Sequence, residues 1–447
     1  MIAASSPLLT DLYQLNMLQA YLDHGETEEA VFEFFVRKLP AHRQFLVAAG
    51  LAQALDLLET MRFTPGELDW LKATGRFKQN LIDYLAAFRF RGHVHAMPEG
   101  TVFFANEPIL RVSASLPEAQ LVETRLINIL HYQTLIASKA ARFVLLAPGK
   151  LLVDFGLRRA HSAEAGLMAA RASYIAGFAG TATLLAEKEF AIPTFGTMAH
   201  SYVQAHDDEA IAFERFASSR PDNLTLLIDT YDCEAAARKI VALAPRLKAR
   251  GIAIGAVRID SGDLIALSRR VRFILDQGGL TNVTVFASGG LDEEEVKAIV
   301  ASQAPIAGLG IGTSLTVSAD APALDCAYKL QEYAGRPRRK RSAGKATWPG
   351  RKQVWRREAD GKIIGDVIGL EDDREPGAPL LEQVMADGQR FGAQPSLLQI
   401  RTHAAKQLQK LPGNLKGLEA GAGYPVHISD SLRQLADAFD AGLNGHN

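Results

Sequence analysis

Two different hydrophobic patterns run along this chain of 447 residues. Over the first 30 residues, leucines recur at the spacing of one helix face, and Gly25 follows as a stop signal. Residues 31–40 then alternate, with Phe32 and Phe34 on one face and Glu33 on the other, which predicts an antiparallel strand. Helical spacing dominates residues 43–90, and short strands are predicted over 92–113. Residues 1–145 are therefore predicted to form an α+β domain.

After residue 145 the pattern changes to short, continuous apolar runs, each followed by a polar tip and a helical stretch. Such runs are typical of buried parallel strands, and their spacing of roughly 25 to 45 residues leaves room for one βα unit each. Six units without a long interruption favour a (β/α) barrel over two Rossmann halves, and neither GxGxxG nor GxxxxGK[ST] is present. The runs are residues 151–155, 191–197, 224–229, 253–259, 283–288 and 306–312.

The barrel pattern ends near residue 332. The segment that follows, 333–447, opens with a strongly basic stretch and continues with a hairpin pattern that turns at Asp360-Gly361. The basic stretch is either a solvated connector or an anion-binding loop. The chain is thus divided at 1–145, 146–332 and 333–447.

Composition excludes several classes of protein. Hydrophobic residues make up 48% and charged residues 22%, which is typical of globular chains. The net charge of -1 gives no general attraction to nucleic acid or to a membrane surface. Cys233 and Cys326 are isolated, which fits a cytoplasmic location without disulfides or thiolate zinc. The longest uncharged stretch, 298–319, contains Pro305 and three glycines, so it is read as a strand and a loop; no membrane span or secretory signal is expected.

Glycine-rich tips follow the last two predicted strands. They are Ser288-Gly289-Gly290 and Gly310 to Ser314, which includes Gly312 and Thr313. Such loops let backbone N–H groups approach an anion, and late barrel strands commonly hold a sugar phosphate. The alternative is that these glycines only make tight βα turns.

The fourth tip combines a cation with carboxylates. Arg258 and Asp260 alternate onto one side of the strand, where the guanidinium suits an anion and the carboxylate suits a hydroxyl group or Mg²⁺. An ordinary Asp/Ser helix cap is the alternative, and it explains Arg258 less well. His200 by itself is more often structural than catalytic. Taken alone, the residues predict a barrel enzyme for a phosphorylated sugar and a further anion. The remaining polar or aromatic tip residues are Asp154, Phe155, Arg158, Arg159, Thr197, Ser201, Asp229, Tyr231, Asp232, Ser261 and Asp263.

Nine short motifs in order resemble those of nicotinate phosphoribosyltransferase. They include TDLYQLNM (10–17), DFGLRRAH (154–161), FGTMAHSYVQA (195–205), VRIDSGDL (257–264) and GIGTSLTVS (310–318). The others are FEFFVRKLP (32–40), DTYD (229–232), ASGGLDE (287–293) and KRSAGKATWPGRKQVWR (340–356). The resemblance runs from residue 10 to about 360, and the chain after about 375 adds little to it.

The resemblance implies the type II phosphoribosyltransferase fold, an irregular α/β barrel with an α+β domain built from both chain ends. Segment 333–447 would then return to the α+β domain. The resemblance also implies an enzyme of the ATP-dependent ligase class that condenses nicotinate with phosphoribosyl diphosphate, in NAD salvage. Mg²⁺ is the implied cofactor, ATP the co-substrate, and a homodimer with shared active sites the implied assembly.

Site roles also follow from the resemblance. His200 matches a histidine that ATP phosphorylates, and Asp260 lies near the ribose hydroxyls or Mg²⁺, with Asp229 as a second metal candidate. Phe155 and Tyr13, the latter from the second subunit, would hold the pyridine ring, and Arg258 would pair with the nicotinate carboxylate. The remaining implied residues are Arg158 and Ser201 for substrate, Ser288, Gly289, Gly290, Gly312 and Thr313 for the 5′-phosphate, and Lys329 and Lys345 for diphosphate or ATP.

Three alternatives were weighed. Nicotinamide phosphoribosyltransferase resembles this chain, but its relatives carry an aspartate at the position of Ala182, where it would repel a carboxylate substrate. Quinolinate phosphoribosyltransferase is usually much shorter. A catalytically inactive barrel that acts as a sensor or scaffold would have lost some of His200, Arg258, Asp260 and the glycine tips.

Overall fold

The computed structural model describes residues 6–419, 421 and 423–444, and of 443 and 444 only the backbone. The chain forms two compact units. Unit 1 combines residues 1–138 with 323–447, and unit 2 contains residues 139–322. These borders lie close to the predicted segment ends at 145 and 332. Both ends of the chain therefore belong to one unit.

Unit 1 is built on a seven-stranded sheet with strands from both ends of the chain. The strand order is β13-β12-β1-β5-β3-β17-β18, and the pairings are antiparallel. Because β1 pairs with both β5 and β12, the late strand β12 completes a sheet that the early strands begin. The strands are β1 (Glu29–Val36), β3 (His93–Ala96), β5 (Pro108–Ser115), β12 (Cys326–Tyr333), β13 (Arg336–Pro337), β17 (Glu382–Ala386) and β18 (Gln389–Arg390).

Two smaller sheets and a set of helices complete unit 1. One sheet has the order β16 (Ala378–Pro379), β14 (Lys352–Ala359), β15 (Lys362–Leu370) and β19 (Val426–Ile428), and β2 (Leu46–Val47) pairs with β4 (Val102–Phe103). The predicted hairpin turn is confirmed: Asp360 and Gly361 join β14 to β15 with φ of 49° and 70°. The helices are α1 (Leu12–His24), α2 (Leu51–Thr60), α3 (Pro65–Ala73), α4 (Gln79–Ala87), α5 (Leu116–Leu121), α15 (Leu397–Lys410), η2 (Gly413–Leu415) and α16 (Asp430–Asn444). The border between the units falls within α6 (Glu123–Leu146).

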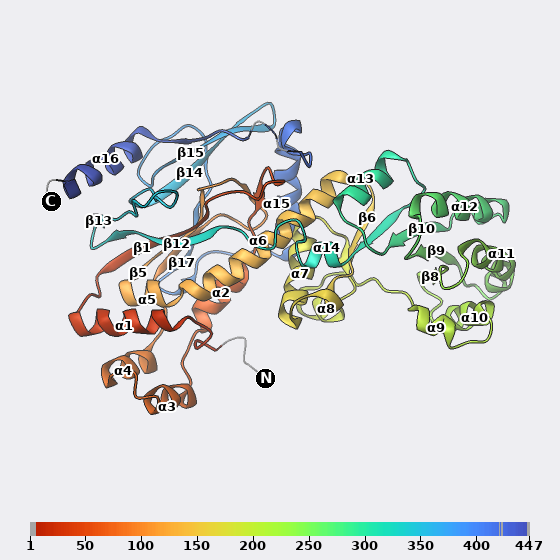
Figure 1. Cartoon of the computed structure of the whole chain (residues 1–447), viewed down its shortest axis with the longest axis horizontal. Helices are drawn as coiled ribbons and strands as arrows, with labels where there is room; N and C mark the ends of the chain where they lie inside the picture. The colour runs from red at the N-terminus through yellow and green to blue at the C-terminus, as the bar shows by residue number, and fades with distance from the viewer. Residues whose placement is uncertain (1–5, 420, 422, 445–447) are drawn as a thin grey trace. The chain divides into compact units, whose positions relative to one another are not determined.

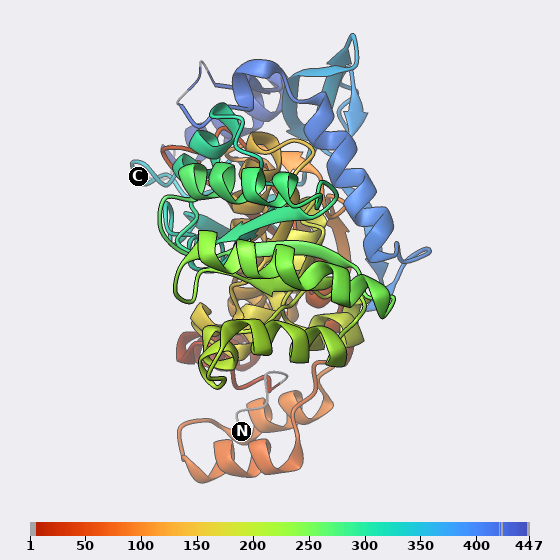
Figure 2. The ribbon, with the colours of Figure 1, turned by 90° about the vertical axis from the view of Figure 1, so that its right-hand side faces the viewer.

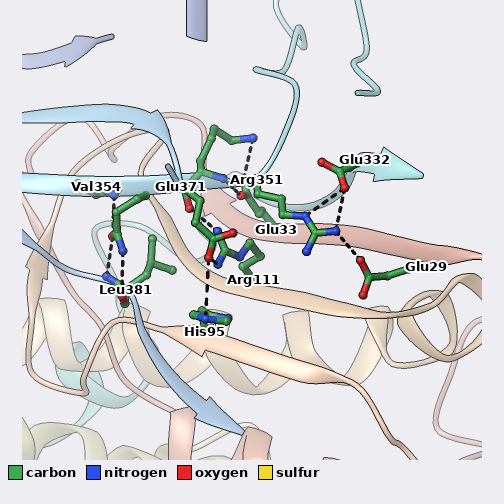
Figure 3. A network of polar contacts seen from close by, with 11 residues as sticks. Glu29, Glu33, His95, Arg111, Glu332, Arg351, Val354, Glu371 and Leu381 are labelled. Carbon is green, nitrogen blue, oxygen red and sulfur yellow. Dashed lines mark hydrogen bonds and ion pairs between the residues drawn. The ribbon is translucent and has the colours of Figure 1, made fainter. Parts of the chain in front are cut away.

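The predicted antiparallel strand is confirmed as β1, and both of its faces are buried. Every residue from Ala30 to Val36 is buried, because the C-terminal strands cover the face on which Glu33 lies. The Glu33 carboxylate is compensated there by the Lys352 ammonium at 2.8 Å. Arg111 on β5 donates to the backbone carbonyl of Lys352 at 2.9 Å. It also pairs with Glu371, as Figure 3 shows. These buried ionic contacts join the N-terminal sheet to the hairpin segment, a pairing that alternation within β1 could not reveal.

Unit 2 contains a six-stranded parallel sheet in the order β7-β6-β11-β10-β9-β8. The two edge strands are not paired with each other, so the sheet is an open half-barrel rather than a closed cylinder. Helices follow most strands, and α10, α11 and α12 lie side by side along one side of the sheet (Figure 2). The strands are β6 (Leu151–Asp154), β7 (Gly180–Thr181), β8 (Leu224–Leu227), β9 (Ile254–Ile259), β10 (Thr284–Ser288) and β11 (Gly308–Ile311). The helices are η1 (Leu157–Arg159), α7 (Ala163–Ala176), α8 (Leu184–Phe190), α9 (His200–Gln204), α10 (Glu209–Ser219), α11 (Cys233–Ala249), α12 (Leu264–Gln277), α13 (Glu293–Ala301) and α14 (Thr313–Thr316) (Figure 1).

Five of the six predicted barrel strands are confirmed, and the one at 191–197 is wrong. That segment makes a single parallel bridge, Thr194 to Thr181, and the strand that pairs with β6 is the short β7 instead. Pro193 lacks an N–H group for a strand ladder. Its carbonyl oxygen accepts from Thr181 at 3.1 Å, and a side chain on Gly180 would collide with it. The absence of a side chain at Gly180 thus lets the Pro193 segment lie against β7. The hydrophobic pattern of a single segment cannot predict this contact.

Within the described residues, no helix is long and apolar enough to cross a membrane. The stretch 298–319 forms the end of α13, the strand β11, the helix α14 and their connections. Cys233 and Cys326 are both free thiols.

Candidate active site

A cavity of about 430 Å³ opens at the carboxyl ends of β6, β9, β10 and β11 in unit 2. In parallel sheets these ends meet at one edge, so tip residues far apart in sequence become neighbours. The cavity brings together most of the predicted barrel residues. It is lined by Phe155, Arg158, Arg159, Arg258, Asp260, Ser288, Gly289, Gly290, Leu291, Asp292, Gly310, Gly312, Thr313, Ser314 and Ala319.

The two glycine loops form adjacent walls of this cavity because β10 pairs directly with β11. Gly289 and Gly290 have φ of 92° and 64°, and a side chain on Gly289 would collide with the carbonyl oxygen of Asp260. Glycine is therefore required there by both conformation and space. Across the cavity wall, the Ser314 hydroxyl is buried without a hydrogen-bond partner in the described structure. A buried hydroxyl donor without a partner, beside exposed backbone in a glycine loop, suits an anionic ligand.

An aromatic ring and a guanidinium lie side by side in the same cavity. The Arg258 guanidinium carbon is 5.5 Å from the centre of the Phe155 ring, within the range of a cation–π contact. The ring packs over Gly310, where an added Cβ would come within 2.6 Å of the ring carbons. Phe286 on β10 packs against Phe155, with ring centres 5.8 Å apart. Sequence reasoning missed Phe286, although its register opposite Arg258 follows once β9 and β10 are paired.

Three hydrogen bonds hold the Arg258 guanidinium. Nε donates to the Ser288 hydroxyl at 2.8 Å, one terminal nitrogen to Asp260 Oδ1 at 2.7 Å, and the other to the Thr197 hydroxyl at 3.2 Å. Ser288 in turn donates to Asp260 Oδ1 at 2.5 Å. Burial raises the pKa of Asp260, but these hydrogen bonds and the Arg258 and His200 charges outweigh it and hold the pKa below its ordinary value. The carboxylate therefore stays ionised beside the guanidinium.

His200 lies at the start of α9, on the side of Asp260 that faces away from Arg258. Its Nε2 is 3.8 Å from Asp260 Oδ2, and its Nδ1 is 3.2 Å from the Thr230 hydroxyl. Ser201, predicted to bind substrate, follows His200 on α9 with an exposed side chain and does not line the cavity. The structure thus connects His200 to the cavity through Asp260.

Asp229 is the other predicted metal candidate. Its Oδ2 accepts from the Asp260 backbone N–H at 3.0 Å and from the Ser261 hydroxyl at 2.6 Å, whereas Oδ1 is buried without a hydrogen-bond partner. An unpartnered carboxylate oxygen fits a hard cation such as Mg²⁺. No group of three His, Cys, Asp or Glu side chains in the described residues forms a complete ligand set, however. The remaining ligands would have to come from substrate or water.

Asp154 supports the floor of the cavity from a buried position. Its oxygens accept from the Gly156 N–H at 2.8 Å and from the Thr181 hydroxyl at 2.7 Å. Burial, only partly offset by these two bonds, raises the pKa of Asp154 to about 6. Sequence reasoning treated Asp154 as a tip residue, whereas the structure makes it an anchor for the turn that carries Phe155.

Three predicted residues lie in unit 1. Tyr13 and Lys329 meet at one buried carboxylate, because the Tyr13 hydroxyl and the Lys329 ammonium each lie 3.3 Å from Glu123. Burial first, and the Glu123 charge second, raise the pKa of Tyr13, so its hydroxyl stays protonated. Lys345 is exposed in the basic loop. Glu123 was missed because nothing in its local sequence indicates two partners so distant in the chain.

Fold and site together define the class: a type II phosphoribosyltransferase architecture, in which a parallel half-barrel presents an aromatic ring, an arginine and two glycine loops at its strand ends. The N-terminal domain model of nicotinate phosphoribosyltransferase matches residues 8–131, the family model matches 151–336, and the C-terminal domain model matches 377–436. The chain belongs to the nicotinate phosphoribosyltransferase family.

Curated relatives agree over nearly the full length. The chain is 48% identical to nicotinate phosphoribosyltransferase pncB2 of Mycobacterium tuberculosis, over 95% of this chain and 92% of the relative. It is 41% identical to a nicotinate phosphoribosyltransferase of Bacillus subtilis, over 83% and 77% of the two chains. The crystal structure of human nicotinic acid phosphoribosyltransferase superposes with a TM-score of 0.86 at 27% identity, covering 96% of this chain and 99% of the human chain.

Proposed function

We propose that this protein condenses nicotinate with phosphoribosyl diphosphate to form nicotinate mononucleotide and diphosphate, a step of NAD salvage. The observation that carries the proposal is the pair Phe155 and Arg258, 5.5 Å apart in the cavity that also contains both glycine loops. An aromatic face beside a fixed guanidinium suits a flat aromatic carboxylate. The neighbouring loops suit a sugar phosphate. The names of the curated relatives agree with this substrate pair.

The reaction needs alignment more than acid–base chemistry. The nicotinate ring nitrogen is already a nucleophile, and diphosphate is a good leaving group. The protein must hold the two substrates in line and stabilise the charge that develops at the ribose carbon and on the departing diphosphate. Three hydrogen bonds pre-organise Arg258, and Asp154 anchors the turn beneath Phe155. Asp260, which is ionised and held by Arg258 and Ser288, is the proposed partner of a ribose hydroxyl or of cationic charge.

Mg²⁺ is proposed as the cofactor and ATP as the co-substrate. Asp229 and Asp260 are the residues that would hold Mg²⁺, which neutralises diphosphate charge when bound, and the unpartnered Asp229 Oδ1 supports this assignment. His200 is the proposed acceptor of a phosphoryl group from ATP, with ADP as the leaving product. Its position 3.8 Å from Asp260 would place the new negative charge next to the metal-binding carboxylates, where it favours retention of Mg²⁺.

A homodimer with shared active sites is also proposed, with Tyr13 of the partner subunit as the second ring that holds the pyridine. Tyr13 supports this role by its exposed position and protonated hydroxyl. A cytoplasmic location is proposed because both cysteines are free thiols.

A product assay tests the proposal. Nicotinate and nicotinamide are offered separately with phosphoribosyl diphosphate and magnesium chloride, with and without ATP, and the mononucleotides are separated by chromatography. Nicotinate mononucleotide is the expected product, at a higher rate with ATP. Ala182 has an exposed side chain beside β7 and supplies no acceptor for a carboxamide N–H, which favours nicotinate. Turnover of nicotinamide alone, or of neither base, would overturn the proposal.

A further inference from the structure

Four charged side chains lie together in unit 2, outside the cavity; Lys139, Arg142 and Glu293 are buried, and Asp320 is partly exposed. Lys139 and Arg142 come from the later turns of α6, Glu293 begins α13, and Asp320 follows α14 (Figure 1). The exposed fractions of these side chains are 1% for Lys139, 9% for Arg142, 7% for Glu293 and 16% for Asp320. The mechanism proposed above uses none of them.

Each cation contacts both carboxylates. The Lys139 ammonium lies 2.5 Å from Glu293 and 2.8 Å from Asp320. Arg142 lies 3.0 Å from Asp320, and its Nε is 3.1 Å from Glu293 in an ion pair without hydrogen-bond geometry. The four side chains form a closed ring of alternating charge, here named the four-charge ring. Removing one member leaves an uncompensated buried charge, so the ring acts as a unit.

Each carboxylate of the ring directly follows, in the sequence, a residue that lines the cavity after one of the two glycine loops. Glu293 follows Asp292, which lines the cavity at the end of the Ser288 to Gly290 loop. Asp320 follows Ala319, which lines the cavity beyond the short helix α14 and donates its backbone N–H to the Ser314 carbonyl oxygen at 3.1 Å. The ring therefore joins the segments that follow both loops to one pair of cations on α6.

We propose that Lys139 and Arg142 are positioning residues for the substrate phosphate, because the four-charge ring fixes the separation and orientation of the two glycine loops. The inference rests on the proposed function in one respect, the assignment of these loops to the 5′-phosphate. Backbone N–H donors bind an anion well only when they are held within about 0.5 Å of the binding geometry. Glycine-rich loops have the greatest conformational freedom, so they most need to be fixed by their surroundings. Buried ion pairs contribute little net stability compared with apolar side chains of the same volume. The positioning of the two glycine loops is thus a better explanation than stability for the four ion pairs of this ring.

The test separates positioning from stability by removing one pair of opposite charges at a time. The double variant Lys139→Met/Glu293→Gln keeps side-chain volume and leaves Arg142 paired with Asp320. The matched control is Arg356→Met/Asp366→Asn, which removes a buried pair of unit 1 with exposed fractions of 2% and 0%. Melting temperature is measured for both, and binding of phosphoribosyl diphosphate and of ribose 5-phosphate is measured by calorimetry with magnesium chloride and without nicotinate.

Both double variants are expected to melt at a lower temperature, but only Lys139→Met/Glu293→Gln should weaken binding of both ligands, by about tenfold or more, which corresponds to about 1.4 kcal/mol. Affinity within about twofold of the wild type in a folded Lys139→Met/Glu293→Gln protein would overturn the inference. If that variant does not fold, Lys139→Arg, which keeps the charge and changes its geometry, is judged by the same criterion. Wild-type protein that binds ribose 5-phosphate but makes no nicotinate mononucleotide would refute the proposed reaction and leave the ring to be tested on its own.

Discussion

Gly310→Ala tests the arrangement of the proposed nicotinate site without touching a group that binds substrate. The added Cβ would lie 2.6 Å from two carbons of the Phe155 ring and 3.1 Å from Phe286. Carbon atoms pack at about 3.5 to 4.0 Å, so the Phe155 ring must move by roughly 1 Å. Overpacking of this kind costs about 1 to 3 kcal/mol, which is a factor of about 5 to 150 in an equilibrium constant. Because the ring also contacts the Arg258 guanidinium, the displacement disturbs both parts of the proposed pyridine site.

The assay is steady-state kinetics with each substrate varied in turn. The KM for nicotinate is expected to rise by about tenfold or more, with a smaller change in the KM for phosphoribosyl diphosphate. Gly255→Ala is the matched control, since Gly255 lies on β9 of the same sheet, with β10 between it and β11, and its added Cβ would meet only the Leu224 carbonyl oxygen at 3.5 Å. An unchanged nicotinate KM in a folded Gly310→Ala protein would refute the placement of the pyridine ring against Phe155.

Three further predictions concern charged groups of unit 2. His200→Ala should abolish the stimulation by ATP and leave the circular dichroism spectrum unchanged; ATP-dependent kinetics equal to wild type would exclude the phosphohistidine role. Arg258→Ala should raise the nicotinate KM by about 100-fold, as expected for the loss of a charge-assisted pair of about 2 to 3 kcal/mol, and an unaltered KM would remove Arg258 from the carboxylate site. Asp154→Asn should gain stability relative to wild type as pH rises. The folded-state pKa of about 6 lies above the ordinary value of 3.8, so ionisation of Asp154 disfavours the folded state between these values. Urea unfolding at pH 4.5 and pH 7.5 should show the difference in unfolding free energy shifting by about 2 kcal/mol towards the variant, and a pH-independent difference would contradict the buried carboxyl.

Most barrel strands could be predicted because parallel strands covered on both faces leave a continuous apolar run in the sequence. The strand predicted at 191–197 was wrong because apolar content takes no account of Pro193, which lacks the N–H donor that a strand ladder needs. Apolar content also does not show that Gly180 leaves space for the Pro193 carbonyl oxygen. In β1 the alternating pattern was real, but both faces are buried. The sequence alone does not show that the Glu33 carboxylate is buried beside Lys352, more than 300 residues later in the chain.

The site was predictable where chemistry resides in the tips of consecutive strands. Arg258, Asp260 and the two glycine loops follow strands that the sequence identifies, and the rule that these ends meet at one edge of the sheet places them together. Phe286 and Glu123 were missed as functional candidates, since each acts through a neighbour that only pairing or packing supplies. Asp154 was predicted as a tip residue, whereas the structure buries it as an anchor for the turn that carries Phe155. Ser201 was predicted to bind substrate by its place beside His200, yet it does not line the cavity.

The sequence by itself determined the family, the βα rhythm of unit 2 and the residue types available at each strand end, because these depend on local periodicity and on short motifs. Only the tertiary structure decided that the sheet remains an open half-barrel, that the cavity places Phe155 beside Arg258, and that four charged side chains form a closed ring at the segments that follow the glycine loops. Such contacts join segments tens to hundreds of residues apart. Their energies depend on distance and burial in the folded chain, and neither quantity is encoded in any local stretch of sequence.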